Sequence, residues 1–481
     1  MKRLQLIILG AIASFAFPPY NLWFLIVLFL FPIRFAFNTS SSIKAFQAGF
    51  LFALGLFFSG IFWIYISLNS YSNVNIFISL GSVLLLSAYL SLFYGVANAS
   101  LTFIRNRAHP LYLALGVAIV FSFAELIKGS ILGGFNWFTV YHSQLYGPFR
   151  GLFPLFGGSG VSFLILYTIG LFAVFPEINE KKRKKILVQM IMGFIVSFLF
   201  FEFHWTTSSP TGYQFSLVQG GFTQDQRLNP RFQQLMQNFY FTEVSDEISE
   251  SDIVILPEGS FINSNAIRSL TPIDGKMIIT GALEVNSNGN AFNSIFAIGD
   301  EIQSYQKRFL VPFGEFIPGE QIFESSLKAL RLPIPRITPG EILQQPLIFK
   351  DILIGPSICF EDSFSKTYAN FISSNIFINL TNDAWFDDSI GLDQHLAFSQ
   401  IRSLEYGKPM LRVANTGITA HIDSNGMILS RLAINEQNVL RGPLIVAQGN
   451  TPYGIFGELL LVFCLLIVVI VQSVITKLRI F

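Results

Sequence analysis

Membrane-length apolar stretches dominate the first 203 residues of this chain and return once near its end. An α-helix needs about 20 consecutive apolar residues to cross a bilayer. A mean hydropathy of +0.53 and a 13% share of charged residues also lie outside the range of ordinary soluble proteins. We therefore expect a polytopic α-helical membrane protein with about eight transmembrane helices, at residues 5–18, 21–37, 46–68, 76–104, 110–127, 151–175, 186–203 and 455–476.

Basic residues are distributed unevenly around these stretches. If the connections alternate across the membrane, one side receives most of the lysines and arginines, while the short loops opposite hold only Lys128 and Arg150. Basic residues are retained on the cytoplasmic side, so we expect both termini to be cytoplasmic and the block 204–454 to face outward. The cations assigned to the cytoplasmic side are Lys2, Arg3, Arg34, Lys44, Arg105, Arg107, the run 181–185, Lys477 and Arg479.

Two further points follow from charge and from the N-terminus. The formal net charge of +1 gives no general attraction for nucleic acid. Residues 1–13 also fit a cleaved signal peptide, with Ala11 and Ala13 at the cleavage site. That alternative would leave the topology of everything downstream unchanged.

The polar block between the seventh and eighth stretches is long enough to fold as one domain. Helical start and stop signals occur at Asn229-Pro230 and at Gly407, and residues 287–290 form a hairpin-turn sequence. Strand-like runs alternate with these helices, which predicts an α/β layered fold. The predicted strands are 215–218, 253–256, 277–280, 294–298, 352–358, 376–380, 410–413 and 418–422.

Two residues that could act as base or nucleophile follow the ends of predicted strands. Glu258 comes after the run 253–256, and Cys359 comes directly after 352–358. Ligands in α/β sheets collect beyond the carboxyl ends of the strands, so we expect these two side chains to share a site. Lys307 lies between them in sequence. Taken singly, each residue has an ordinary interpretation: a buried cysteine is usually a small inert hydrophobe, and the other two are typical surface charges.

A nucleophilic thiol must be activated by a base or a cation. No histidine is obviously placed for this: His204 starts the polar block, while His395 and His421 lie on a predicted helix and strand without an acidic partner nearby in sequence. A Cys-His enzyme stays open but unsupported. Alternatively Glu258 takes the thiol proton, and a lysine stabilises the oxyanion that forms when the thiolate attacks a carbonyl.

The order Glu258, Lys307, Cys359 resembles the Glu-Lys-Cys triad of the nitrilase superfamily, whose fold is an αββα sandwich. The surrounding residues resemble one membrane-bound branch of it, the apolipoprotein N-acyltransferases. Seven membrane spans before the catalytic domain and one after it is also that family's arrangement. The matching segments are Val218–Gly220, Tyr305, Leu310–Glu315, Pro318, Ser357–Asp362, Asn382–Phe386, Gln394-His395, Arg402, Glu405, Pro409, Leu411-Arg412, Asn415–Ala420 and Thr451–Gly454.

The likeness covers nearly the whole chain and implies three parts. These are a membrane domain of seven helices at 1–203, an extracytoplasmic nitrilase-like domain at 204–454, and a last transmembrane helix with a cytoplasmic tail at 455–481. Some positions depart from the family's usual residues without removing a catalytic group: Asn136 and Thr223 where proline is common, Gly221 where asparagine is, and Phe360 where tyrosine is.

The resemblance implies a two-step acyl transfer at the periplasmic face of a bacterial inner membrane. Glu258 would deprotonate Cys359, which takes an acyl chain from a phospholipid, phosphatidylethanolamine by implication, and passes it to the α-amino group of the diacylglyceryl-cysteine of an apolipoprotein. Lys307 and the backbone amide after the nucleophile would bind the oxyanion, with Glu315 and Glu361 orienting the lysine. No cofactor or metal is implied.

Aromatic residues beside these motifs are candidates for contact with lipid. They are Trp385, Phe313, Phe316 and, in the aromatic loop 135–146, Trp137. The alternative is packing of the domain or an ordinary interfacial belt. The segments 313–320 and 383–392 contain glycines that would permit them to act as lids over a water-sensitive thioester.

Two other functions fit the same sequence. One is a membrane-anchored nitrilase-type amidase that hydrolyses a small amide with the same triad. The other is a non-catalytic scaffold for lipid binding or transport, although the predicted spans hold few acidic residues, Glu125 and, near span ends, Glu202 and Glu458, where a transporter would show a polar path. The five histidines are scattered and the two cysteines are far apart, so the sequence predicts no metal site.

Overall fold

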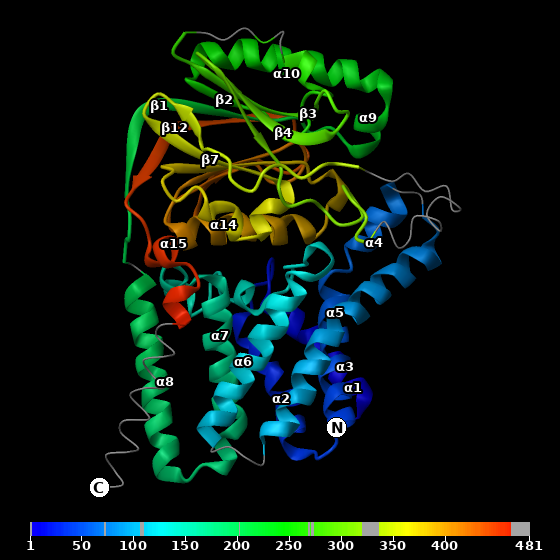
Figure 1. The fold of residues 1–481 in the computed structure, drawn as a ribbon, viewed down its shortest axis with the longest axis vertical. Helices are drawn as coiled ribbons and strands as arrows, with labels where there is room; N and C mark the ends of the chain where they lie inside the picture. The colour runs from blue at the N-terminus through cyan, green and yellow to red at the C-terminus, as the bar shows by residue number, and fades with distance from the viewer. Residues whose placement is uncertain are drawn as a thin grey trace.

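The computed structural model describes residues 2–71, 74–105, 110–201, 203–267, 270, 274–319 and 336–462. A bundle of helices carries an α/β part on one end, and the N-terminus lies at the opposite end (Figure 1). The main helices of the bundle are α1 (Arg3–Ala13), α2 (Leu30–Asn38), α3 (Ser42–Gly60), α5 (Ile76–Ile104), α6 (Pro110–Lys128), α7 (Phe153–Val174) and α8 (Glu180–Phe201).

Three helical segments of the described residues are long and apolar enough to cross a membrane, namely Ser42–Gly60, Ile76–Ile104 and Arg150–Glu177. Shorter apolar helices cover Arg3–Ala16, Trp23–Asn38 and Ile186–Phe201. Helix α5 leaves large apolar side chains such as Leu85 exposed, as expected for a surface that faces lipid. The total of about eight stays a prediction, and most of its last stretch, 455–476, lies outside the described residues.

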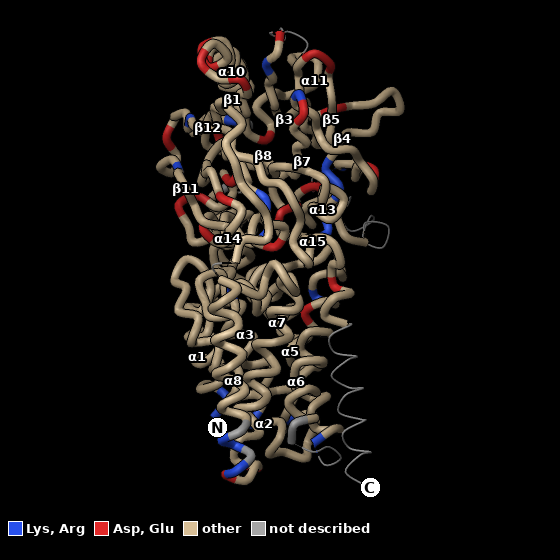
Figure 2. The backbone as a smooth tube through the Cα atoms, turned by 90° about the vertical axis from the view of Figure 1, so that its left-hand side faces the viewer, with Lys and Arg blue, Asp and Glu red and all other residues tan. Residues whose placement is uncertain are grey.

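Lysines and arginines gather at the end of the bundle remote from the α/β part, whereas acidic residues are concentrated in the α/β part (Figure 2). The middle of the bundle shows few charges in this view. A band with few charges between two charged ends is the pattern of a structure that spans a bilayer.

Two six-stranded sheets form the α/β part, in the orders β12-β1-β2-β3-β4-β5 and β11-β10-β9-β8-β7-β6. In each sheet three neighbouring strands are parallel, β1-β2-β3 in one and β7-β8-β9 in the other. The strands are β1 (Thr207–Gln219), β2 (Ile253–Ile255), β3 (Met277–Val285), β4 (Ala291–Ile298), β5 (Ile302–Gln306), β6 (Leu347–Phe349), β7 (Ile352–Ile358), β8 (Ile376–Thr381), β9 (Met410–Ala414), β10 (Ala420–Ile422), β11 (Ile428–Arg431) and β12 (Asn438–Gln448).

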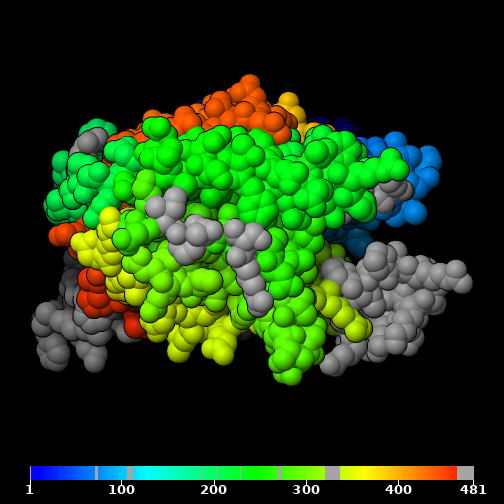
Figure 3. Space-filling view, turned by 90° about the horizontal axis from the view of Figure 1, so that it is seen from above, coloured from blue at the N-terminus to red at the C-terminus, as the bar shows by residue number. Residues whose placement is uncertain are grey.

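The layers stack in the order helix, sheet, sheet, helix, bundle (Figure 1). Helix α10 (Pro230–Glu250) covers the first sheet on the face remote from the bundle, where it and neighbouring segments form the upper surface (Figure 3). Ile255 and Ile354 belong to the core between the sheets. Helix α14 (Gly391–Tyr406) is buried on two sides, because Leu396 packs toward the sheets and Phe398 toward the bundle. This confirms the predicted αββα sandwich.

Most predicted elements are present. All eight predicted strands occur, and β7 has the predicted bounds. Helix α10 begins at the Asn229 cap, and α14 ends at Gly407, whose φ of +63° is the left-handed conformation of a helix C-cap. Strands β5, β6, β11 and β12 were not predicted, because they are short or lie at sheet edges where polar side chains interrupt the apolar pattern.

Candidate active site

Cys359 lies where β7 turns into the short 3-10 helix η8 (Cys359–Ser363). Its φ of +51° is in the left-handed region that L side chains rarely adopt, so the turn is strained at the sulfur-bearing residue. Its carbonyl oxygen accepts a hydrogen bond from Asn379 Nδ2 at 3.3 Å. Burial raises the pKa of the Cys359 thiol well above its usual range; Glu258 raises it further and Lys307 opposes this. The resting group is therefore a thiol that needs a base.

Glu258, Asn293, Lys307 and Glu315 form one hydrogen-bonded group, called here the base cluster. Lys307 Nζ lies 2.9 Å from Glu315 Oε1 and 3.7 Å from Glu258 Oε1. Asn293, on β4, donates from Nδ2 to both carboxylates, at 2.7 Å to Glu258 and 3.1 Å to Glu315. The structure thus brings the predicted glutamates and lysine together and adds an asparagine that the sequence did not mark.

The base cluster holds one more negative charge than positive charge. Burial alone would lower the pKa of Lys307, but Glu315 and Glu258 outweigh burial and raise it. The lysine is therefore an ammonium between two carboxylates. Glu258 keeps contact with solvent, with 13% of its side chain exposed, and its Oε2 accepts the backbone N–H of Asn382 at 2.9 Å. A carboxylate in this position can accept a proton.

Glu361 is fully buried and joins two strand ends. Its carboxylate accepts hydrogen bonds from the Tyr305 hydroxyl at 2.8 Å and from the backbone N–H groups of Arg308 and Ile358 at 2.8 and 2.9 Å. The family resemblance implies that Glu361 orients the lysine. In the described contacts that role falls to Glu315, while Glu361 ties the end of β5 to the end of β7.

A second polar group lies on the other side of the nucleophile and is called here the support cluster. It consists of Asp362, Asp383, His395 and Arg412, all buried. His395 Nδ1 lies 2.7 Å from Asp383 Oδ1, and His395 Nε2 lies 3.3 Å from Asp362 Oδ1. Arg412 bridges the same two carboxylates, with Nη1 3.1 Å from Asp362 and Nη2 2.8 Å from Asp383.

The charges of the support cluster balance. Burial would lower the pKa of His395, but the aspartates, Asp383 foremost, outweigh it and raise the pKa to about 9. Burial would raise the pKa of Asp383, but His395 and Arg412 lower it to about 2. The sequence marked no acidic partner near His395, and its partners Asp362 and Asp383 come from other elements of the fold.

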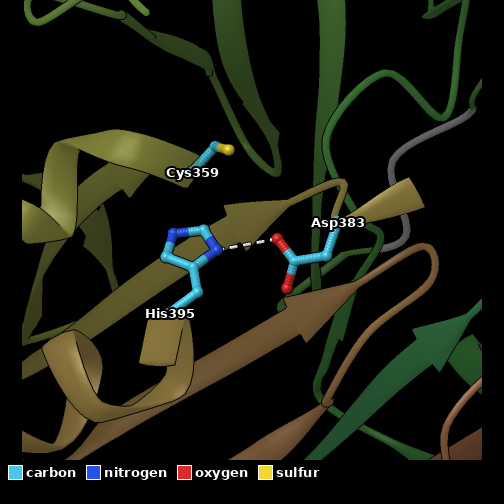
Figure 4. A group of neighbouring side chains, drawn as sticks. All are labelled: Cys359, Asp383 and His395. Carbon is cyan, nitrogen blue, oxygen red and sulfur yellow. Dashed lines mark hydrogen bonds and ion pairs between the residues drawn. The ribbon is translucent and has the colours of Figure 1, made fainter. Parts of the chain in front are cut away.

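Cys359, Asp383 and His395 each present one donor atom, and these atoms lie within 4.8 Å of one another (Figure 4). By distance and ligand type they could hold a transition metal. However, both nitrogens of His395 already face carboxylates, and Arg412 supplies a cation to the other oxygen of each of these carboxylates. A metal ion would have to displace a proton and compete with a guanidinium. The group is better suited to support the nucleophile than to bind a metal.

The aromatic candidates fall into different environments. Phe313 is 72% exposed and Trp385 is 41% exposed, so both are available to contact a substrate. The carbonyl of Trp385 accepts a hydrogen bond from the Ser67 hydroxyl at 2.6 Å, which joins its loop to the bundle. Phe316 is half-buried and packs on Gly133, where an added Cβ would stand 2.8 Å from its ring.

The loop 135–146 packs at the junction between the helical bundle and the αββα sandwich. Trp137 is only 4% exposed, and its ring stacks on Phe360 with centroids 5.9 Å apart. Asn136 Nδ2 donates to the carbonyl of Ser363 at 3.1 Å. Trp137, expected as a lipid-binding candidate, is thus a packing residue in this structure. Asn136 and Phe360, which depart from the family pattern, take part in the same junction.

Gly221 and Thr223, the other two positions that depart from the family pattern, shape the local backbone. Gly221 has a φ of +64°, and a Cβ there would stand 3.1 Å from the backbone of Glu436. The Thr223 side chain caps the short helix α9 (Gln224–Leu228) by accepting the N–H of Gln226. Neither residue contacts the base cluster or the support cluster in the described hydrogen bonds.

Comparisons with known proteins cover nearly the whole chain. Residues 9–171 match the family described as apolipoprotein N-acyltransferase N-terminal domain, and residues 246–447 match the carbon-nitrogen hydrolase family. The apolipoprotein N-acyltransferase of Wigglesworthia glossinidia brevipalpis is 30% identical over 98% of this chain and 97% of its own length. Those of Nitrosomonas europaea and Photobacterium profundum are 31% and 29% identical over 88% and 93% of this chain, and over 86% and 90% of their own lengths.

Proposed function

The chain belongs to the apolipoprotein N-acyltransferase family, and from this premise we propose that it moves an acyl chain from a membrane phospholipid, through a thioester on Cys359, to the α-amino group of the diacylglyceryl-cysteine of an apolipoprotein. The enzyme is an acyltransferase of lipoprotein maturation. Phosphatidylethanolamine is the donor that we propose. The reacting groups are the Cys359 thiol and the residues of the base cluster.

In the first half-reaction Glu258 takes the proton of the Cys359 thiol, and the sulfur attacks the ester carbonyl of the phospholipid. The tetrahedral oxyanion is stabilised by the Lys307 ammonium and by the backbone N–H after the nucleophile. The carbon–oxygen bond of the ester then breaks. Glu258 returns its proton to the departing oxygen, so a lysophospholipid leaves and a thioester remains.

In the second half-reaction the α-amino group of the lipoprotein attacks the thioester, and Glu258 accepts a proton from that amine. The carbon–sulfur bond breaks, and the thiolate recovers a proton from Glu258 as the amide product leaves. Water must be excluded until the amine arrives, because it would hydrolyse the same thioester. The loops that carry Phe313 and Trp385 are the segments that we propose to shield it.

We propose that residues 204–454 face the periplasm of a bacterial inner membrane, between a membrane domain at 1–203 and a C-terminal helix and tail at 455–481. The cations gathered at the remote end of the bundle support cytoplasmic termini (Figure 2). This placement holds the site at the level of lipid headgroups. Both proposed substrates are amphiphiles anchored in the bilayer, so a soluble domain would rarely meet them.

The observation that carries this proposal is the placement of one thiol between an acid–base group and a helical bundle that resembles a membrane domain, in a chain that N-acyltransferases match over as much as 98% of its length. The test is intact-protein mass spectrometry after mixing the detergent-solubilised enzyme with phosphatidylethanolamine carrying a distinguishable sn-1 chain. We expect an acyl-sized, hydroxylamine-sensitive adduct on the wild type and none on Cys359→Ser.

Adding a diacylated lipopeptide to the acyl-enzyme separates the alternatives. The lipopeptide should remove the acyl adduct from Cys359 and gain the mass of the acyl chain, which identifies a transferase. Loss of the adduct to water at the same rate with and without lipopeptide would favour the amidase. Absence of any adduct in a folded, lipid-bound sample would contradict acyl transfer from phospholipid and favour a non-catalytic scaffold or an amidase with a different substrate.

A further inference from the structure

His395 is a buried ionisable group for which the proposed mechanism has no use. It lies on α14 with 0% of its surface exposed, and one of its nitrogens lies within 4.8 Å of the Cys359 sulfur (Figure 4). A histidine beside a nucleophilic cysteine usually serves as its base. The carboxylates around this ring argue against that role here.

Both nitrogens of His395 face carboxylate oxygens, which accept hydrogen bonds and donate none when ionised. Nδ1 must carry a hydrogen to lie 2.7 Å from Asp383 Oδ1, and Nε2 faces Asp362 Oδ1 at 3.3 Å. With a carboxylate beside each nitrogen the ring is held as an imidazolium at neutral pH, so it already carries the proton that a base for Cys359 would have to accept.

The charged groups around His395 come from separate elements. Asp362 belongs to η8, Asp383 follows β8, and Arg412 lies on β9. Two carboxylates, one guanidinium and one imidazolium sum to zero. Without the imidazolium the cluster would carry a negative charge beside the nucleophile, and the Asp383 carboxylate already disfavours ionisation of Cys359.

The support cluster is also connected to both Cys359 and Glu258, the two reacting groups of the enzyme. Arg412 Nη1 donates to Asn379 Oδ1 at 2.9 Å, and Asn379 in turn holds the carbonyl of Cys359. On the other side Asp383 follows Asn382, whose N–H binds Glu258. A change at His395 is therefore transmitted to the nucleophile and to the base.

We propose that His395 is a positioning residue: clamped as a cation between Asp362 and Asp383, it cancels the carboxylate charge beneath Cys359 and so makes the thiolate easier to form. This inference rests on the proposed role of Cys359 as nucleophile. It adds an electrostatic support that acts from below the sulfur, whereas Lys307 acts from the side of the substrate carbonyl.

The test measures alkylation of Cys359 by iodoacetamide between pH 6 and pH 10, in a Cys464→Ser background. Alkylation reports the thiolate and needs neither lipid nor lipopeptide, so it is independent of whether acyl transfer occurs. We expect His395→Gln to move the profile to higher pH and to slow alkylation at neutral pH, by about tenfold for every pH unit that the profile moves. The double variant Asp362→Asn/His395→Gln restores charge balance and should return within about threefold of wild type.

Three results would overturn the proposal: an unchanged profile in folded His395→Gln, a double variant as slow as the single one, or slower alkylation in Asp362→Asn. The last variant retains the imidazolium and leaves the cluster with an extra positive charge, so it should alkylate faster than wild type. The alkylation rate of Asp362→Asn therefore tests the proposal even if His395→Gln does not fold. Acyl-enzyme formation from phospholipid, measured on the same proteins, reports separately on the proposed function.

Discussion

The base cluster and the support cluster flank Cys359 with similar groups, two carboxylates each, but differ in charge balance and in access to solvent. In the base cluster one lysine serves both Glu258 and Glu315, whose side chains are 13% and 15% exposed. In the support cluster Asp362 and Asp383 share an arginine and a histidine, and every side chain is at most 1% exposed.

The difference follows from what each cluster must do. A group that exchanges protons with substrates needs a carboxylate that is not fully neutralised and that substrates can reach. A group buried beneath a strained turn has no water to stabilise an excess charge, so each of its carboxylates needs a cation. Substitutions in the first cluster should therefore affect mainly rate, whereas those in the second should also lower stability.

The largest effect on rate is expected from Glu258→Gln. The amide has nearly the same shape and size but cannot take the thiol proton, so acyl-enzyme formation should fall by about 10²- to 10⁴-fold. Single-turnover mass spectrometry of the thioester measures it. Glu301→Gln, an exposed change in the β4–β5 hairpin, is the matched control and should behave as wild type. A drop of less than about tenfold in Glu258→Gln would show that another group takes the proton.

Arg412→Met should have the largest effect on stability. It leaves two buried aspartates with only the imidazolium, and removing one partner of a buried ion pair costs about 3–5 kcal/mol. Lys307→Met should lower the free energy of unfolding much less, because its carboxylate partners retain contact with water. Chemical unfolding in detergent compares the two. Equal losses of stability would contradict the expectation that the buried support cluster depends more strongly on its cations than the base cluster does.

Asn293→Ala tests how strictly the base cluster is positioned. Asn293 holds Glu258 and Glu315 with one amide group, and its loss should let Glu258 move relative to the thiol. We expect acylation to slow by about 10- to 100-fold with little change in phospholipid KM. Asn288→Ala, in the exposed hairpin turn, is the control. A raised KM with an unchanged acylation rate would indicate that Asn293 contacts the lipid instead.

The sequence predicted one cluster better than the other, for a physical reason. Glu258 follows β2 of one sheet and Cys359 follows β7 of the other, and ligands collect beyond the carboxyl ends of parallel strands in both. The support cluster joins η8, the end of β8, α14 and β9, and no sequence pattern indicates that these four elements converge on His395. Asn293 lies inside a strand, where the alternation of residues gives no sign of its role.

Raising the pH should weaken the support cluster selectively. The pKa of His395 is raised from an ordinary 6.5 to about 9 in the fold. Its contribution to stability is therefore fully present below pH 6.5 and is lost as the pH rises through 9. Asp383, with a pKa lowered to about 2, contributes above its ordinary 3.8 and loses this as the pH falls through 2. Thermal unfolding in detergent should show a smaller decline between pH 7 and pH 9.5 in His395→Gln than in wild type. Parallel curves would contradict the assigned imidazolium.

The smallest effect concerns Thr381, which links the support cluster to the nucleophile. Its hydroxyl donates to Asp383 Oδ1 at 2.9 Å, and hydrogen bonding by the same side chain lowers the pKa of the Cys359 thiol. Thr381→Val keeps the branched shape without the hydroxyl, so acylation should slow by about three- to tenfold, the worth of one hydrogen bond. Thr381→Ser retains the hydroxyl and should stay near wild type. If Thr381→Val acylates as fast as wild type, this hydroxyl does not couple the support cluster to the sulfur, and the coupling must run through Asn379 and Arg412 alone.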